Sequence, residues 1–568
     1  MQQATSSPLI DSNRSTKERL IEILTAAAVL AVAVAAYALL FNRANVLSHS
    51  IGYNLYASER VLEGDVPYRD FHTLYPPAIF YLNAVLFKWL GVSLYTALLG
   101  ALIFKVLTVV VIYLSGRQVM PRAWALVAAL SGLLWLRPNG PFKSVPMHYG
   151  ALFLALAMYL LLKHENRQKI FSVFLAGASL GLVALFKHNI GAYALAGSVV
   201  FLVAEDRTLK YRFTVDPGNY RRVLVLLIGC AAAIAPALLY MQWNAALAPM
   251  IRTLLFGPGE FLLSRLAVPL SPVAPVLLVA ALAVTMYVTY RLRRHHPIAV
   301  FLWLSLIAAI FVFVLRRDQA EVDQIIFYLP MLVLASGLAI AIFNKAIPIG
   351  ERRSLLIVFI FAAAALMELF PRFAREQSIA AMPLLMLFLF YLLYVLRPAI
   401  KALACGTWQY RLALAVLPIT FLLIEGRLFF NTYFDSNLRF KAGTQVNIER
   451  GGGVYFPAAT AASIGDVVNY VHQRVPPGGY AFAQSDAGTS FLFLSGRRNV
   501  SNAQFWIGVG VTQEERAATL QRIDKSRTKL IITSDEVLAA EKYEPMRDYI
   551  GLHFKASQRF DDVLILER

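Results

Sequence analysis

Residues 20–41 read LIEILTAAAVLAVAVAAYALLF, an apolar run of 22 residues with a single charged side chain, Glu22. About 20 apolar residues in a helix are enough to cross the hydrocarbon core of a bilayer. The run is also too long for the apolar region of a cleaved signal peptide. It therefore predicts a retained first membrane span, preceded by a cytoplasmic tail at 1–19.

Similar apolar runs recur along the chain as far as residue 429. Together they predict about thirteen spans, near 20–41, 93–115, 123–137, 149–162, 170–186, 189–204, 222–241, 271–290, 297–315, 325–343, 354–370, 379–396 and 411–429. The composition agrees, because 58% of the 568 residues are apolar and 15% are charged, whereas soluble domains average about 45–50% and 25%. The predicted fold is a polytopic α-helical membrane protein whose transmembrane domain occupies 20–429.

The charge distribution indicates how the chain is oriented. The 53 Lys and Arg and the 34 Asp and Glu give a net charge of +19, and the basic residues lie mostly in alternate short loops. Such loops face the cytoplasm and its anionic lipids. We therefore expect a multi-pass protein of the cell's inner (cytoplasmic) membrane. The segment after residue 429 should lie outside the cytoplasm. No Lys/Arg run with interleaved aromatic residues indicates a nucleic-acid partner.

The tail at 430–568 has a different pattern. Short strand-like runs at 453–456, 480–484, 530–534 and 562–567 alternate with amphipathic stretches at 459–475 and 512–525. This alternation predicts a small α/β domain outside the cytoplasm. The triplet Gly451-Gly452-Gly453 at its entrance lacks the spacing of a phosphate-binding loop and is typical of a turn.

The first outer loop, residues 42–91, is the most strongly patterned polar segment. On a helical wheel, residues 51–63 divide into an apolar stripe and a face bearing Glu59 and Glu63, and Gly64 provides a C-terminal cap. Pro77 then opens a second helix over 78–90. We expect both helices to lie in the membrane interface, with the polar face of the first helix toward a cavity or water. An amphipathic loop packed on neighbouring spans is the alternative.

Specific motifs in this loop resemble those of a known group of enzymes. They read GYNLYA at 52–57, LEGDVPYRDF at 62–71 and YPP at 75–77. The sequence resembles the first outer loop of bacterial GT-C glycosyltransferases, the relatives of protein O-mannosyltransferases and of the lipid A aminoarabinose transferase. The resemblance covers about 45 residues in motif, and the number of spans and the outer tail extend it to the whole chain.

The resemblance implies an enzyme that transfers a hexose or pentose from a polyprenyl-phosphate donor. The acceptor would be a lipid, a glycan or a protein at the outer face of the cytoplasmic membrane. The donor phosphate needs cationic partners, and the acceptor hydroxyl needs a carboxylate to take its proton.

The sequence departs from the family pattern at three places. Ser50-Ile51 stands where the family usually has an acidic residue before the Gly-Tyr pair. Tyr75 stands where many relatives have the lysine of Lys-Pro-Pro that meets the donor phosphate. The acid expected between the third and fourth spans is also missing, because residues 137–149 contain no carboxylate.

Three loop carboxylates are therefore the candidate catalytic residues. Asp70 comes first, because the turn at 68–71 can project it into a chamber, and Glu59 and then Asp65 follow. Asp70 could instead cap the turn or pair with Arg69. The candidates for binding the donor phosphate or substrate are cationic or polar residues of the outer half: Arg69, Tyr75, Lys143, His148, Lys187, His188, Arg316 and Arg317.

Several of these candidates have simpler explanations. Lys187 and His188 could only snorkel at a span end, and the loop at 316–323 carries enough carboxylates to neutralise its own arginines. Glu368 and Glu425 lie near outer span ends, where we expect them to be solvated or paired.

Other classes of function stay open at this stage. A flippase-like transporter for lipid-linked sugars would show inverted repeats and broken spans in matching halves, and a scaffold without catalysis would explain Ser50-Ile51. No pattern of His, Cys or acids indicates a metal site, so no cofactor is expected. A divalent ion at the donor phosphate is possible but not indicated.

Overall fold

The computed structural model describes the chain in several segments. These are residues 16–38, 41–44, 47, 49–136, 145–204, 217–256, 330, 331, 333–335, 337–342, 347–369, 375–403, 407, 411, 443–503, 511–539, 541 and 543–568. The predicted spans near 271–290 and 297–315 lie outside the described residues, as does the one near 411–429 apart from residue 411, and the one near 325–343 is described only in part.

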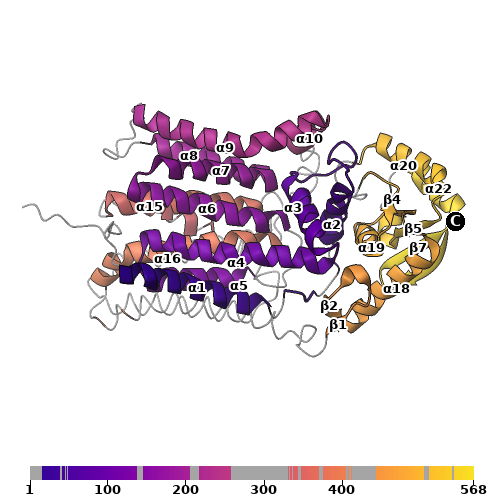
Figure 1. The fold of residues 1–568 in the computed structure, drawn as a ribbon, viewed down its shortest axis with the longest axis horizontal. Helices are drawn as coiled ribbons and strands as arrows, with labels where there is room; N and C mark the ends of the chain where they lie inside the picture. Colours follow the sequence, from indigo (N-terminus) through magenta and orange to yellow (C-terminus); the bar gives the residue numbers. More distant parts are fainter. Residues whose placement is uncertain are drawn as a thin grey trace, which may run out of the picture.

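A bundle of apolar helices forms one end of the molecule (Figure 1). Its helices are α1 (Thr16–Ala38), α4 (Leu94–Val119), α5 (Arg122–Trp135), α6 (Val145–Arg167), α7 (Ile170–Phe186), α8 (His188–Val203), α9 (Pro217–Trp243), α15 (Ile349–Leu366) and α16 (Arg375–Leu403). Among the described helices, five are long and apolar enough to cross a membrane: α1, α4, α6, α9 and α16. The prediction of a polytopic helical membrane protein is confirmed.

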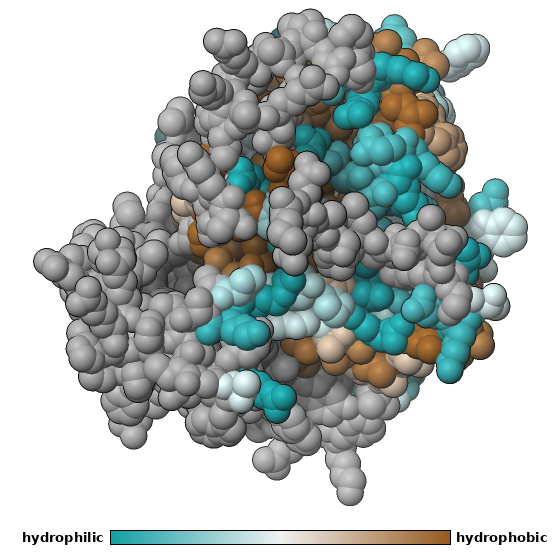
Figure 2. Space-filling view, turned by 90° about the vertical axis from the view of Figure 1, so that its left-hand side faces the viewer, coloured by the Kyte–Doolittle hydropathy of each residue, from teal (hydrophilic) through white to brown (hydrophobic). Residues whose placement is uncertain are grey.

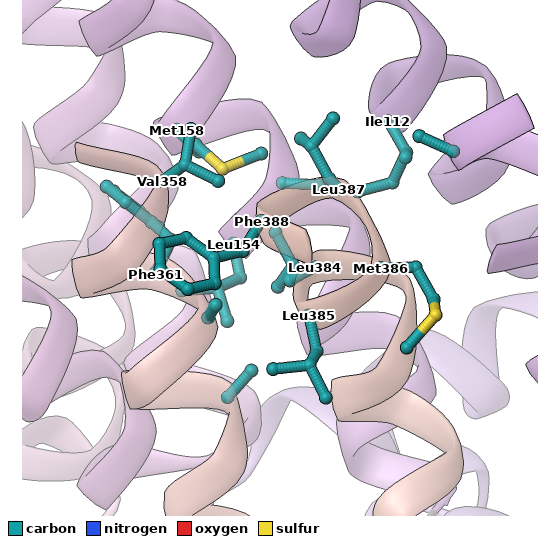
Figure 3. Packing of buried hydrophobic residues seen from close by; sticks show 14 of the residues in the cluster. Ile112, Leu154, Met158, Val358, Phe361, Leu384, Leu385, Met386, Leu387 and Phe388 are labelled. Carbon is teal, nitrogen blue, oxygen red and sulfur yellow. The ribbon is translucent and has the colours of Figure 1, made fainter. Parts of the chain in front are cut away.

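Close packing holds the bundle together. Figure 3 shows large apolar side chains of α4, α6, α15 and α16 meeting in its centre, among them Leu154, Phe361 and Phe388, all with no exposed surface. Helices α7 and α9 approach so closely that a Cβ on Gly177 would lie 1.9 Å from the carbonyl oxygen of Leu226. Small residues permit such contacts between membrane helices, where no hydrophobic effect draws apolar surfaces together.

The first outer loop folds into two short helices at the end of this bundle. Helix α2 spans His49–Leu62, and α3 spans Ala78–Leu90 after the N-cap residue Pro77. Gly64 and Gly91, which follow the two helices, have φ values of +103° and +88°, a region that glycine adopts without steric cost. Both predicted helices are confirmed.

The tail forms an α/β domain at the other end of the molecule, beyond α2 and α3 (Figure 1). Its main sheet has the strand order β4-β3-β5-β7-β6, in which β3, β4 and β5 are parallel and β6 and β7 are antiparallel to their neighbours. The strands are β3 (Tyr480–Ala483), β4 (Arg498–Asn499), β5 (Leu530–Thr533), β6 (Lys555–Phe560) and β7 (Val563–Glu567). A separate antiparallel pair joins β1 (Gly443–Gln445) to β2 (Tyr455–Pro457).

The described part of this C-terminal domain also contains the helices α18 (Ala458–Arg474), α19 (Asp486–Ser495), α20 (Gln513–Lys525), α21 (Asp535–Ala539) and α22 (Glu544–His553). The predicted strands and both amphipathic helices are present. Strands β1, β4 and β6 and helices α19, α21 and α22 were not predicted.

The C-terminal domain rests directly on α2. The Arg450 guanidinium lies 2.6 Å from the Glu59 carboxylate, and the backbone N–H of Asn499 donates to the Tyr56 hydroxyl at 2.6 Å. Glu63 pairs with Arg498 at 2.6 Å. The polar face of α2 therefore contacts the C-terminal domain, and the expectation that it faces a cavity or water is wrong. The cause is long-range, because the partners come from a part of the chain about 400 residues later.

The far end of the bundle carries charge. Hydrophilic side chains gather over the described part of this end (Figure 2). Ion pairs also join the helices near this end: the Glu22 carboxylate lies 3.0 Å from Arg117, and Arg353 lies 2.7 Å from Glu165. The bundle thus has one polar end and one end covered by α2, α3 and the C-terminal domain.

Candidate functional site

An aromatic layer lies between the first outer loop and the bundle. Tyr53 of α2 and Phe80 of α3 have ring centroids 6.5 Å apart, and the Phe80 ring lies 6.0 Å from Phe71 in the turn between the helices. Below them, Tyr149 of α6 stacks on Phe186 at the end of α7, at 5.7 Å. These buried rings form a rigid floor on which the loop is fixed.

Hydrogen bonds hold the chain between the two helices in one shape. Tyr68 has a φ of +68°, an uncommon conformation for a residue with a side chain, and its hydroxyl donates to the carbonyl of Tyr75 at 2.5 Å. The Tyr53 hydroxyl donates to Thr73 and accepts from the N–H of Leu74 at 3.1 Å. Tyr75 is therefore held in place from both sides.

A buried ion pair lies beside Tyr75. The Lys187 ammonium is 5.6 Å from the centre of the Tyr75 ring and 3.0 Å from a carboxylate oxygen of Glu368. Lys187 occupies the break between α7 and α8, and Glu368 lies in the short 3₁₀ turn η2 (Met367–Leu369) that follows α15. The Glu368 side chain is 3% exposed and that of Lys187 is 22% exposed. The pair thus joins two helix ends to the first outer loop, and solvent or a ligand can reach only its lysine readily.

The predicted first candidate, Asp70, is engaged within its own turn. Arg69 donates to its two carboxylate oxygens at 2.9 and 2.7 Å, and the backbone N–H of Val66 donates at 2.7 Å. These hydrogen bonds, with the one from Arg69 first, lower the pKa of Asp70 below its usual value. In this structure Asp70 fixes the turn, which is the alternative that the sequence left open.

The other two loop carboxylates also have arginine partners. Asp65 lies 2.7 Å from Arg60, and Glu59 is held by Arg450 of the C-terminal domain. Burial raises the pKa of Glu59, although the Arg450 guanidinium opposes that shift. Their predicted catalytic roles stay untested predictions, and the geometry gives each of them a place in the scaffold of the loop.

The remaining binding candidates lie in different places. His188 begins α8, next to Lys187, and lies close to the backbone of Leu254 in α10 (Leu247–Phe256). His148 is 3% exposed in the first turn of α6, close enough to Lys105 of α4 to interact with it electrostatically. The Arg69 side chain is 42% exposed, and its guanidinium donates to the carbonyl of Asn244 at 3.4 Å. Lys143, Arg316 and Arg317 lie outside the described residues.

The structure thus brings Tyr75, Lys187 and His188 to one side of the first outer loop. Glu368 joins them, although the sequence placed it among carboxylates expected to be solvated or paired at a span end. Glu368 is paired, as one of the two expected alternatives, and its side chain is buried. Within the described segments, no group of three or more His, Cys, Asp or Glu is arranged to hold a metal ion.

Comparisons with known proteins agree with this architecture. Residues 75–240, less than a third of the chain, match the family model described as dolichyl-phosphate-mannose-protein mannosyltransferase. No curated protein matches the chain.

Solved structures match over nearly its whole length. The oligosaccharyltransferase of Archaeoglobus fulgidus, tethered to an acceptor peptide containing the NVT sequon, is 13% identical with a TM-score of 0.50, over 96% of this chain and 73% of that chain. Its apo form is 14% identical with a TM-score of 0.50, over 92% and 71%. ArnT of Cupriavidus metallidurans, bound to undecaprenyl phosphate, is 14% identical with a TM-score of 0.44, over 97% and 98%.

Proposed function

We propose that this chain, which has the GT-C fold of membrane glycosyltransferases, transfers a sugar from a polyprenyl-phosphate donor to a lipid, glycan or protein acceptor. The observation that carries the proposal is the position of Lys187 beside Tyr75. The family model that covers this region is named for enzymes that use dolichyl-phosphate-mannose, a lipid-linked donor of the same kind.

Lys187 supplies the cation that the loop motif lacks. The family resemblance puts a phosphate-binding lysine just before the Pro-Pro pair, and here Tyr75 occupies that position. The Lys187 ammonium nevertheless lies 5.6 Å from the Tyr75 ring, so a positive charge is present at the same place from another part of the chain. A lysine is a strong point charge for phosphate, and as the donor bond breaks it stabilises the charge that develops on the leaving phosphate.

The neighbouring residues suit a supporting role. Arg69 has an exposed side chain, and His188 directly follows Lys187 in the chain. We assign both residues to binding of the donor phosphate or the sugar. His148 is too deeply buried for direct contact in this conformation, so we assign it to the wall of the site. The roles of Lys143, Arg316 and Arg317 in phosphate binding remain proposals from the sequence.

The location of the site supports a lipid-linked donor. Lys187 lies beside Tyr75 of the first outer loop, and α2 and α3 of that loop lie at the end of the bundle that faces the C-terminal domain (Figure 1). We place the polar end in the cytoplasm on the charge bias of its loops, which puts the site at the outer leaflet of the inner membrane. Nucleotide sugars are cytosolic, whereas a polyprenyl-phosphate sugar can present its headgroup at that leaflet.

Deleting the gene tests the proposal whichever sugar is transferred. Lipid extracts of the deletion strain should accumulate a polyprenyl-phosphate sugar, visible by mass spectrometry, while one envelope glycan, glycolipid or glycoprotein loses that sugar. Reintroducing the gene should reverse both changes. A deletion strain whose polyprenyl-phosphate sugars and envelope glycans both match the parent would overturn the proposed function.

A further inference from the structure

We infer that Tyr68 is a positioning residue of the donor site. Its strained backbone and its hydroxyl fix Tyr75 in the place where the Tyr75 ring lies beside Lys187. This inference rests on the proposed function and deepens it, because it gives an uncharged residue of the first outer loop a task in donor binding.

The backbone conformation of Tyr68 points to a role for its side chain. Its φ of +68° lies in the left-handed region, which a bulky residue rarely adopts and which costs conformational free energy. A glycine at this position would adopt the same φ without that cost. Strain of this kind persists where surrounding contacts fix it, and it gathers at ligand and active sites. The Tyr68 side chain therefore supplies something that a glycine could not.

Contacts of both its backbone and its side chain hold Tyr68 in this conformation. Its backbone N–H donates to the carbonyl of Phe71 at 2.8 Å, which closes the turn. Its side chain is 9% exposed and packs in one cluster with Met241 of α9 and Met250 of α10. A ring fixed in this way directs its hydroxyl to one place.

The hydroxyl of Tyr68 holds the backbone of Tyr75. It donates to the Tyr75 carbonyl at 2.5 Å. On the other side of the same residue, the backbone N–H of Tyr75 donates to the Thr73 hydroxyl at 3.3 Å. Pro76 follows, and a residue before proline is restricted to extended backbone. These constraints together give the Tyr75 ring a defined place.

That place is beside the cation of the proposed donor site. The centre of the Tyr75 ring lies 5.6 Å from the Lys187 ammonium, within the range at which the face of a ring attracts a cation. A shift of the ring would change where the ammonium lies, and a site that is not preorganised binds its ligand more weakly. Tyr68 therefore acts on donor binding through Tyr75.

Binding of undecaprenyl phosphate to purified full-length variants tests the inference. Tyr68→Phe keeps the ring and removes the hydroxyl, and it should weaken binding of this probe by about three- to tenfold, the effect of one ordinary hydrogen bond. Tyr68→Met is a second variant whose adaptable side chain fills the same space without a hydroxyl, and it should show a similar loss. Tyr75→Ala should also weaken binding without abolishing it, because Lys187 remains.

The double variant Tyr68→Phe/Tyr75→Ala separates positioning from stability. The carbonyl that accepts the Tyr68 hydrogen bond belongs to the backbone, so it remains in Tyr75→Ala. Removing the hydroxyl should therefore lower the melting temperature in both backgrounds. It should weaken probe binding only where the Tyr75 ring is present, and a double-mutant cycle measures such a non-additive effect.

Tyr37→Phe is the matched control. The Tyr37 hydroxyl is also buried, and it donates to the backbone carbonyl of Leu133 at 2.8 Å. Its removal should lower the melting temperature and leave the affinity for undecaprenyl phosphate at the parent value. Equal losses of affinity in Tyr37→Phe and Tyr68→Phe would reflect general destabilisation and would overturn the inference.

The remaining outcomes separate the inference from the proposed function. The parent should bind the probe and consume the donor accumulated in deletion-strain membranes. If it does so, and Tyr68→Phe and Tyr68→Met bind the probe as tightly as the parent, Tyr68 only supports the fold and the proposed function stands. The inference fails in the same way if the hydroxyl contributes equally to binding in the Tyr75→Ala background. If the parent neither binds the probe nor consumes donor, the proposed function fails and the inference fails with it.

Discussion

At the scale of single residues, the charged side chains near Tyr75 form ion pairs with one another. Arg69 and Asp70 are adjacent in the chain and bind one another through two hydrogen bonds, so they stabilise the turn that positions Tyr75. Lys187 and Glu368 are 181 residues apart and are also paired, and their pair joins two helix ends beside Tyr75. The Asp70 carboxylate is bound by an adjacent arginine and by the backbone N–H of Val66, so its hydrogen bonds shape the turn.

Asp70→Asn tests the role of Asp70 in the turn. The pKa of Asp70 is below its usual value, so its charge stabilises the fold above the unfolded pKa of about 3.9, and this contribution is lost as the pH falls through the folded value. The variant should therefore melt below the parent at pH 7, by an amount worth up to about 1 kcal/mol because solvent screens the partly exposed pair. The difference should shrink below about pH 4.

Turnover of the same variant gives a second, independent readout. If Asp70 only shapes the turn, Asp70→Asn should lose less than about tenfold in turnover. A loss of about 10²–10⁴-fold with unchanged melting would instead identify it as the general base, as the sequence alone suggested.

At the scale of elements, α2 is the joint between the membrane domain and the C-terminal domain. Its Tyr53 packs on the aromatic floor of the site, while Glu59 and Glu63 pair with arginines of the C-terminal domain. Helix α3 adds a second contact, because Phe87 stacks on Phe493 of α19 at 5.9 Å. Displacing the C-terminal domain would therefore disturb the loop that carries Tyr75.

Two arginine variants measure how much the ion pairs between α2 and the C-terminal domain contribute to the free energy of unfolding. Arg450→Ala leaves Glu59, whose side chain is 10% exposed, as a charge without its partner, and should cost about 1–3 kcal/mol of unfolding free energy. Arg498→Ala breaks a pair whose side chains are 48% and 38% exposed and should cost about 0–1 kcal/mol. Thermal unfolding in detergent compares the two, and equal costs would contradict the burial argument.

The elements that the sequence predicted share local signals. Pro77 and Gly91 mark the two ends of α3, and the period of apolar residues predicted α18 and α20. Strand β6 was missed because its residues, KASQRF, are mostly exposed and show no apolar alternation. Helix α19 was missed because DAGTSFLFLS reads as a short apolar run without a clear helical period.

The candidate site was harder to predict, because its ion pairs join residues that are far apart in the sequence. The motif located the first outer loop correctly, and the charge of Lys187 was recognised. The partner of Lys187 was not, because Glu368 is distant in sequence and only the packing of α8 against α15 brings the two together. The arginine that binds Glu59 comes from the C-terminal domain, which local patterns cannot place.

At the scale of the whole molecule, the two ends of the bundle are chemically different. One end is polar, with ion pairs such as Glu22–Arg117, and the other is covered by α2, α3 and the C-terminal domain (Figure 1). The charge bias predicts that the polar end is cytoplasmic. The C-terminal domain should then lie outside the cytoplasm, on the same side as Lys187.

A topology reporter checks this orientation. An enzyme active only in the periplasm should be active when fused after Arg568, and a cytoplasmic fluorescent protein at the same position should stay dark. A second fusion in the turn at 168–169, between α6 and α7, should give the opposite result. The reverse pattern at both positions would move the site to the cytoplasmic side and remove the argument for a lipid-linked donor.

The identity of the donor is the central claim, and a transfer assay with purified protein tests it most directly. The protein is supplied with acceptor isolated from the deletion strain free of polyprenyl phosphate, and with one labelled sugar, presented either on polyprenyl phosphate or as its nucleotide sugar. We predict transfer of label from polyprenyl phosphate and none from the nucleotide sugar, with release of one polyprenyl phosphate for each sugar transferred. Transfer from the nucleotide sugar in the absence of any polyprenyl phosphate would contradict the account.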